Sequence, residues 1–221
     1  TTPIATVALN GDAIHIGGGL HLPGLAPYDA VSVMMRQAIL VAPLLLARRY
    51  LAGEAAQRDV LRALAVAGLV YTAPILVELR LSPQLHVWTY GFFPHSFAQQ
   101  IRGSGFRPVV FLGHGLMVAI FIAMALVAAA ALARTAPPRE RGGWAAAAGW
   151  LGIMLFLCKS YTALALGALF APLALFAGRG FRRAAVAAVA VLVLAYPVLR
   201  GADVVPTRTI VEQASMIDPD R

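Results

Sequence analysis

The sequence predicts an all-α protein, a polytopic transmembrane bundle of about six membrane-spanning helices. Of its 221 residues, 60% are hydrophobic and only 13% are charged, and the mean hydropathy is +0.76. A soluble domain is roughly half apolar and about a quarter charged. Here long apolar runs alternate with short basic loops, which is the pattern of an integral membrane protein.

Six apolar runs predict the membrane spans. They cover residues 30–47, 60–79, 109–133, 144–157, 161–177 and 184–199. The third run is long enough to cross about 30 Å of hydrocarbon with some tilt, whereas the fourth and fifth are shorter than the roughly 20 residues that a span needs. We therefore expect the short pair to meet at Lys159 inside the outer leaflet.

Residues 30–199 form the predicted bundle, and the remaining segments are loops. Residues 1–29 are rich in glycine and proline, which predicts an irregular segment at the outer face. Residues 81–107 are too polar to span and form an aromatic outer loop, and residues 200–221 begin a polar periplasmic segment. Because the chain lacks an initiator methionine, we expect it to be a piece of a longer protein.

Arginines determine the predicted orientation. The loops 48–62, 134–141 and 179–183 carry Arg48, Arg49, Arg58, Arg62, Arg134, Arg139, Arg141, Arg179, Arg182 and Arg183. Cytoplasmic loops are enriched in arginine and lysine, so these three loops are predicted to be cytoplasmic. The same rule accounts for most of the net charge of +8, and we therefore expect no nucleic-acid partner.

The sequence carries no familiar motif of soluble catalysis or metal binding. It has no Gly-x-Ser-x-Gly elbow, no phosphate-binding glycine loop and no His-Glu-x-x-His helix. Cys158 is the single cysteine, which excludes an internal disulfide and a cysteine zinc cluster. The spacing of His86, His95 and His114 fits no metal site, so we expect neither a metal nor a cofactor.

A set of cations at the predicted outer face is not explained by the positive-inside rule. Its members are Arg80, Arg102, Arg107, Lys159 and Arg200. If the helix ends converge, these side chains form a pocket for a lipid diphosphate, because guanidinium groups bind phosphate oxygens in a bidentate manner. Alternatively, each cation anchors its own helix at the headgroups. His114 lies near Arg107 in sequence and joins the candidate substrate-binding residues.

Arg107 is the central residue of this set. Pro108 favours an extended Arg107 and a helix that begins at Pro108 or just after it. The guanidinium would then lie beside the positive end of a helix, an arrangement that favours an anion between the two. We expect it to face the bundle, within reach of Lys159 or of bound phosphate.

The stretch that follows Arg107 resembles the O-antigen ligase and O-antigen polymerase superfamily of bacterial inner membranes. It contains Arg107-Pro108, Phe111 and Gly113-His114 directly before an apolar helix. Members of that family often show an Arg, a Gly, an aromatic residue and a Pro-Asn pair at this point. Here Val110 stands at the glycine position, and Gly115-Leu116 replace the Pro-Asn pair.

A second short motif extends the resemblance. The turn Cys158-Lys159-Ser160 is similar to the Ser-Lys/Arg-Ser/Gly turn of the family. The order of elements also fits, because two short helices are followed by a basic loop, one further helix and a polar outer segment. The resemblance covers roughly residues 30–221, through short motifs. In the family that last segment is a large periplasmic loop with a second arginine and a catalytic histidine.

The resemblance implies an inverting, metal-independent glycosyltransferase of polysaccharide biosynthesis. Its substrate would be an undecaprenyl-diphosphate-linked glycan, which it would transfer or polymerise at the periplasmic face of the inner membrane. Arg107 would be the catalytic residue that holds the diphosphate and stabilises the leaving group, and Lys159 would assist it. No residue matches the catalytic base, so this piece alone would be inactive.

A non-catalytic membrane subunit or a transporter fragment is the alternative. In that case the outer cations would contact membrane lipids or other subunits, and the alanine-rich segments 128–131 and 145–148 would pack closely against neighbouring helices.

The orientation is testable with engineered cysteines and an impermeant thiol reagent. We expect a cysteine in the loop 134–141 to resist labelling from the outside, and one in 81–107 to be labelled. Labelling of the loop 134–141 in sealed cells would contradict the predicted topology.

Overall fold

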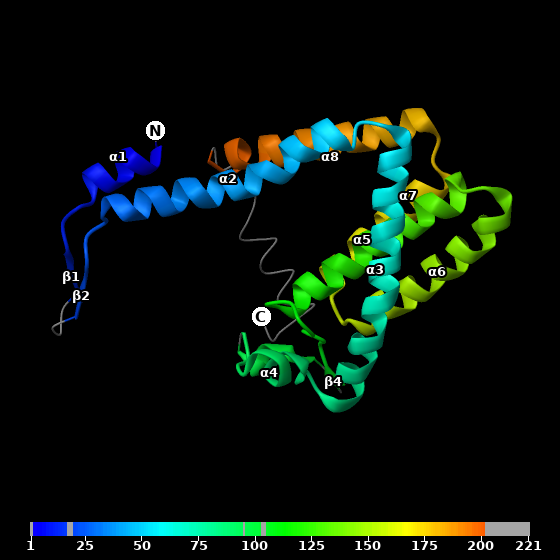
Figure 1. Ribbon diagram of the computed structural model, residues 1–221, viewed down its shortest axis with the longest axis horizontal. Helices are drawn as coiled ribbons and strands as arrows, with labels where there is room; N and C mark the ends of the chain where they lie inside the picture. The colour runs from blue at the N-terminus through cyan, green and yellow to red at the C-terminus, as the bar shows by residue number, and fades with distance from the viewer. Residues whose placement is uncertain (1, 17–19, 95, 103–104, 202–221) are drawn as a thin grey trace. The chain divides into compact units, whose positions relative to one another are not determined.

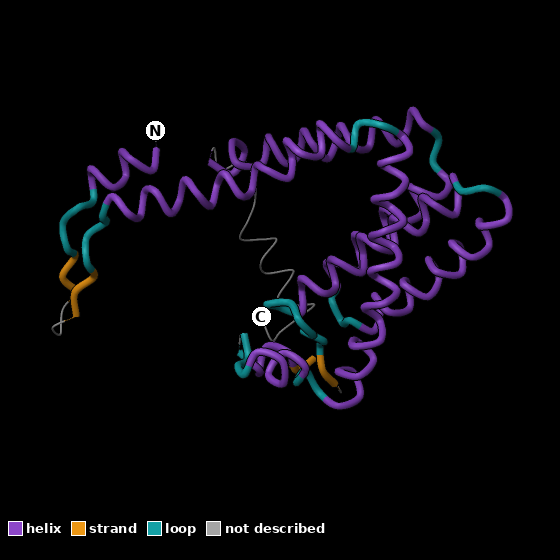
Figure 2. The backbone as a smooth tube through the Cα atoms, in the orientation of Figure 1, coloured by secondary structure: helices purple, strands orange, loops and turns teal. Residues whose placement is uncertain are grey.

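The structure is a computed structural model that describes residues 2–16, 20–94, 96–102 and 105–201. It is all-α, as predicted, and Figures 1 and 2 show the helical character of these segments. The α-helices in the described ranges are α1 Thr2–Leu9, α2 Pro27–Tyr50, α3 Glu54–Leu81, α4 Leu85–Tyr90, α5 Gly115–Thr135, α6 Pro138–Leu157, α7 Tyr161–Phe176 and α8 Arg179–Gly201. The predicted segment 202–221 lies outside the described residues.

Each predicted span corresponds to a helix, namely α2, α3, α5, α6, α7 and α8. Of these, α2, α3, α5 and α8 are long and apolar enough to cross a membrane, and α7 is a shorter apolar helix of 16 residues. Some boundaries were wrong: α5 begins at Gly115 rather than at residue 108 or 109, and α6 and α8 begin at Pro138 and Arg179, inside the predicted loops 134–141 and 179–183. The chain is therefore a membrane protein by the length and composition of its helices.

The two predicted outer loops contain more regular structure than expected. Residues 1–29 include α1 and an antiparallel pair of strands, β1 Ile14–Ile16 and β2 Leu20–Leu22. Residues 81–107 include α4, the 3-10 helix η1 Phe97–Gln100, and the paired strands β3 Ile101–Arg102 and β4 Gly105–Phe106. Such short elements have too few residues to show a periodic apolar pattern.

The chain divides into two compact units, residues 1–60 and 61–221. In the first unit, α1 packs against α2, and the Leu25 backbone N–H donates to the Asn10 carbonyl at 2.9 Å. The apolar side chains of α2 are almost all exposed. Arg36 is also exposed along this helix.

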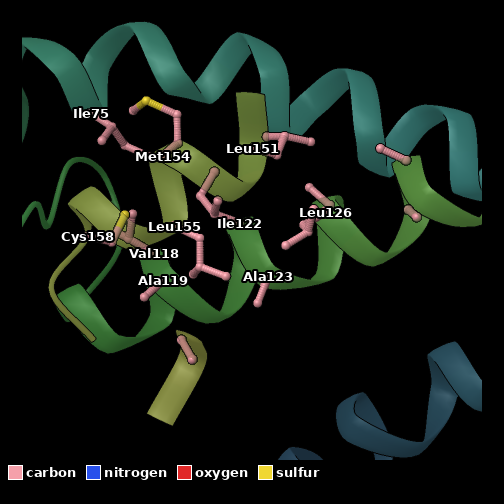
Figure 3. Close-up of a cluster of buried hydrophobic side chains, with 14 of the residues drawn as sticks. Ile75, Val118, Ala119, Ile122, Ala123, Leu126, Leu151, Met154, Leu155 and Cys158 are labelled. Carbon is pink, nitrogen blue, oxygen red and sulfur yellow. The ribbon is translucent and has the colours of Figure 1, made fainter. Parts of the chain in front are cut away.

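The hydrophobic core of the second unit lies around α5, which packs against both α6 and α7. Figure 3 shows Ile122 and Leu126 of α5 among Leu151 and Met154 of α6, with Ile75 of α3 covering the cluster. These five side chains are buried. Many other buried positions of α5 are alanines, and small residues let helix backbones approach closely.

Polar contacts tie the helices together at one end of this unit. Arg62 of α3 forms an ion pair with Glu140 at the start of α6, with a 3.0 Å N–O distance. Arg134 at the end of α5 donates to the Leu175 carbonyl of α7 at 3.3 Å. The arginine-rich segments 134–141 and 179–183 therefore share the end where α6 and α8 begin, and Arg107 belongs to the opposite end.

Gly68 sets the closest approach of α3 to α5. A Cβ atom at Gly68 would lie 2.3 Å from the Ala125 Cβ, whereas one at Gly149 of α6 would meet nothing within 4 Å. We expect Gly68→Ala to lower the free energy of unfolding by about 1–3 kcal/mol through overpacking. Gly149→Ala is the matched control and should gain up to about 1 kcal/mol from helix propensity.

Unfolding in mixed detergent and SDS micelles measures both variants. Equal stability of the two variants would contradict a close contact at Gly68.

Candidate functional site

Arg107 is buried at one end of the second unit. Its side chain is only 3% exposed, and its guanidinium Nη2 donates to the Ser160 hydroxyl at 3.0 Å. Its backbone N–H donates to the Gln100 carbonyl at 2.7 Å, which holds the residue next to β3 and β4. Arg107 therefore joins the segment before α5 to the turn between α6 and α7.

Lys159 belongs to that same turn. It has a φ of 51°, a left-handed conformation that lets the chain reverse between Cys158 and Ser160. A Cβ atom at Gly105 would lie 2.7 Å from the Lys159 Nζ, so the ammonium lies against the Gly105 backbone. Gly105 lies two residues before Arg107, and Arg107 contacts Ser160, the residue after Lys159, so the two cations lie on neighbouring segments.

Glu78 holds the backbone next to Arg107. Its carboxylate is fully buried and accepts hydrogen bonds from the N–H groups of Val109 and Val110, each at 2.7 Å. It also accepts from the Leu85 N–H at 3.0 Å. These backbone groups surround the carboxylate, whereas Arg80, two residues further along α3, is exposed.

This carboxylate explains a strained residue. Val110 has a φ of 52°, a region that β-branched side chains rarely adopt. Two charge-assisted hydrogen bonds to adjacent N–H groups offset the conformational cost, which is of order 1–3 kcal/mol. They also explain why α5 begins at Gly115, since residues 109 and 110 form a turn instead of helix.

The first turn of α5 lies directly against Arg107. A Cβ atom at Gly115 would lie 2.8 Å from the Arg107 Cδ and 2.9 Å from the Gln100 Oε1, so this position accepts only glycine without rearrangement. Gln100 is fully buried, and its amide has no hydrogen-bond partner among the described residues. The guanidinium, the amide and the positive end of α5 therefore lie together.

His114 is the N-cap of α5. Its Nδ1 accepts from the Leu116 N–H at 3.0 Å, which satisfies one of the free N–H groups of the first turn. His114, one of the substrate-binding candidates from the sequence, therefore caps α5 in the structure.

The other candidate cations are placed differently. Arg80 is exposed in the last turn of α3, and Arg102 belongs to β3, with its side chain outside the described residues. Arg200 is exposed in the last turn of α8, and Figure 1 shows that end of α8 apart from α4 and β4. Of the candidate cations, Arg107 and Lys159 thus lie on neighbouring segments, whereas Arg200 belongs to the last turn of α8.

His86 and Cys158 are surrounded by other groups of the protein. The His86 Nδ1 lies 2.9 Å from the Phe92 carbonyl, and its ring contacts Tyr90 and Phe92. Burial raises the pKa of the Cys158 thiol to about 12, against a lowering by Arg107, so this thiol is neutral at physiological pH. No group of three or more His, Cys, Asp or Glu side chains in the described ranges is placed to bind a metal.

Sequence reasoning missed the roles of Glu78 and Gln100. The sequence signal for Glu78 was an acidic residue near the end of an apolar run, and such residues are costly unless they are partnered. Its partners come from the backbone 31 and 32 residues away, which no local pattern reveals.

Glu78→Gln tests the importance of this carboxylate for the fold. The amide would place an NH₂ donor near three N–H donors, so we expect unfolding to be easier by about 3 kcal/mol. Glu140→Gln is the control, because its ion pair with Arg62 is largely exposed and should contribute under about 1 kcal/mol. Detergent unfolding curves measure both, and equal losses would contradict the anchoring role.

Comparison with known proteins finds no similar family or structure. No protein-family model matches the chain, and neither a curated protein nor a solved structure matches it. The function is therefore inferred from the residues and geometry of this chain.

Proposed function

We propose that this chain is part of a bacterial inner-membrane protein that resembles the O-antigen ligases and polymerases. Its substrate would be an undecaprenyl-diphosphate-linked glycan, bound at the end of the bundle that carries Arg107. One observation carries the proposal: Arg107 is buried against Ser160 and the first turn of α5, beside Lys159.

The local charges favour a diphosphate ligand. Arg107, Lys159 and the N-terminal end of α5 are positive elements gathered in one place, and like charges repel at short range. A diphosphate between them would turn this repulsion into attraction, and its oxygens suit the planar fork of a guanidinium. The Ser160 hydroxyl and the Gln100 amide add neutral hydrogen-bonding groups to the same place.

The backbone conformation gives independent support to the resemblance. Val110 has a φ of 52°, in the left-handed region that favours glycine. It stands at the position where the family motif has glycine. A glycine at this position would favour such a turn after the arginine, and this chain forms the turn with a valine held by Glu78.

The chemistry follows from the charges. In an inverting transfer, an acceptor hydroxyl forms a bond to the anomeric carbon while the bond from that carbon to the diphosphate oxygen breaks. The leaving diphosphate gains negative charge, and fixed cations in a site of low dielectric stabilise that charge in the transition state. Arg107 and Lys159 would do this, and the group that accepts the hydroxyl proton would come from another part of the protein.

Arg107→Lys and Arg107→Ala test this role in the full-length protein. We expect both to lose at least about 90% of glycan ligation or polymerisation, because an ammonium does not replace the bidentate fork. Arg139→Lys is the matched control, since Arg139 is exposed in the first turn of α6, at the opposite end of the bundle. Glycan length and ligation in a complementation assay are the readout, with membrane abundance measured in parallel.

Normal glycan output from Arg107→Ala at normal abundance would contradict the catalytic role. It would favour the alternative of a non-catalytic membrane subunit. The exposed apolar side chains of α8 support that alternative, because none of the described residues of this helix is buried in this chain.

A further inference from the structure

An apolar groove runs along the second unit, and Arg107 is not among the described residues that line it. It lies between α5 and α7, and it is also lined by Leu61 and Leu64 of α3 and by Arg182 and Val186 of α8. The cavity has a volume of about 480 Å³, within the range of roughly 300–1,000 Å³ that small-molecule sites occupy. Its principal lining side chains are Ile120, Met124, Val127, Leu166, Phe170 and Leu173.

Arg182 is the one charged residue among the described residues that line this groove. Its Nε is buried and has no hydrogen-bond partner in the part of the chain that the structure describes. A buried guanidinium nitrogen without a partner is costly, and a ligand with an anionic oxygen would remove that cost. The groove therefore combines a long apolar surface with one cation, Arg182, in its lining.

The position of Arg182 strengthens this preference for an anion. It lies in the first turn of α8, next to Arg179 and Arg183, and that turn contains no acidic residue. The N-terminal end of a helix already carries partial positive charge, so three arginines there repel one another and the helix end. An anionic group at this point would stabilise all of them.

We propose that the groove binds an anionic phospholipid, with one acyl chain along α5 and α7 and the headgroup phosphate on Arg182. The groove is open to the apolar surroundings of a membrane helix, and basic pockets between such helices bind anionic headgroups. An isoprenoid tail alone fits less well, because its hydrocarbon offers no oxygen to the buried Nε. The predicted topology places this site in the cytoplasmic leaflet, at the end of the bundle opposite Arg107.

The test uses the full-length protein in mixed micelles with phosphatidylglycerol or phosphatidylcholine, and native mass spectrometry counts the bound lipids. We expect the wild-type protein to retain phosphatidylglycerol at least about tenfold more tightly than phosphatidylcholine. Arg182→Gln should lose most of this preference. Arg183→Gln is the matched control, because it removes the same charge from an exposed neighbour that does not line the groove, and it should keep the preference.

A second variant tests the acyl-chain part of the site. Val127→Phe would fill the groove, and we expect it to weaken retention of both lipids. Thermal unfolding without added lipid shows whether each variant is folded, and only folded variants are compared. If Val127→Phe does not fold, Phe170→Leu takes its place. This variant shortens a lining side chain and enlarges the groove, and it should keep the headgroup preference.

Three results would overturn the proposal. Equal losses from Arg182→Gln and Arg183→Gln would show diffuse attraction to a basic loop, without a defined site. Displacement of phosphatidylglycerol by the uncharged alcohol undecaprenol at equal concentration would show that the groove selects hydrocarbon alone. Retention of both phospholipids to the same extent would likewise exclude recognition of the phosphate by Arg182.

Discussion

The buried Glu78 carboxylate is the interaction on which the candidate site depends. It collects the N–H groups of Val109, Val110 and Leu85, and so joins the end of α3 to α4 and to the turn before α5. A carboxylate inside a membrane protein is tolerated when such donors surround it. Because that turn is anchored, Arg107 enters the bundle from an extended segment and reaches Ser160, instead of extending outward from a helix that begins at Pro108.

The two ends of the second unit carry positive charge in different ways. At one end, Arg62 of α3 contacts an acidic side chain and Arg134 of α5 contacts a carbonyl. This is the end that the positive-inside rule predicts to be cytoplasmic. At the other end, Arg107 is withdrawn from the surface, and its surroundings are a hydroxyl, a glycine backbone and a helix terminus. The first arrangement agrees with the predicted orientation, and the second is the one on which the proposed diphosphate site rests.

Small residues make this geometry possible. Gly68 allows α3 to cross α5, Gly105 leaves room for the Lys159 ammonium, and Gly115 leaves room for the Arg107 side chain. In a lipid environment, helices associate through close packing more than through the exclusion of water, so glycines at the interface favour contact by letting the backbones approach. The same close packing brings the segments that carry Arg107 and Lys159 next to each other.

The sequence by itself determined the class of the protein, the approximate positions of its six long helices and the distribution of its arginines, because apolar runs and basic segments are local patterns. It also identified Arg107 and Lys159 among the cations outside the usual pattern. Only the tertiary structure decided that α5 begins at Gly115, that Glu78 binds backbone N–H groups, and that Arg107 contacts Ser160. The physical reason is distance along the chain: Arg107 and Ser160 are 53 residues apart, and Glu78 and Val110 are 32 apart. Contacts of that kind follow from how helices cross, which no single helix encodes.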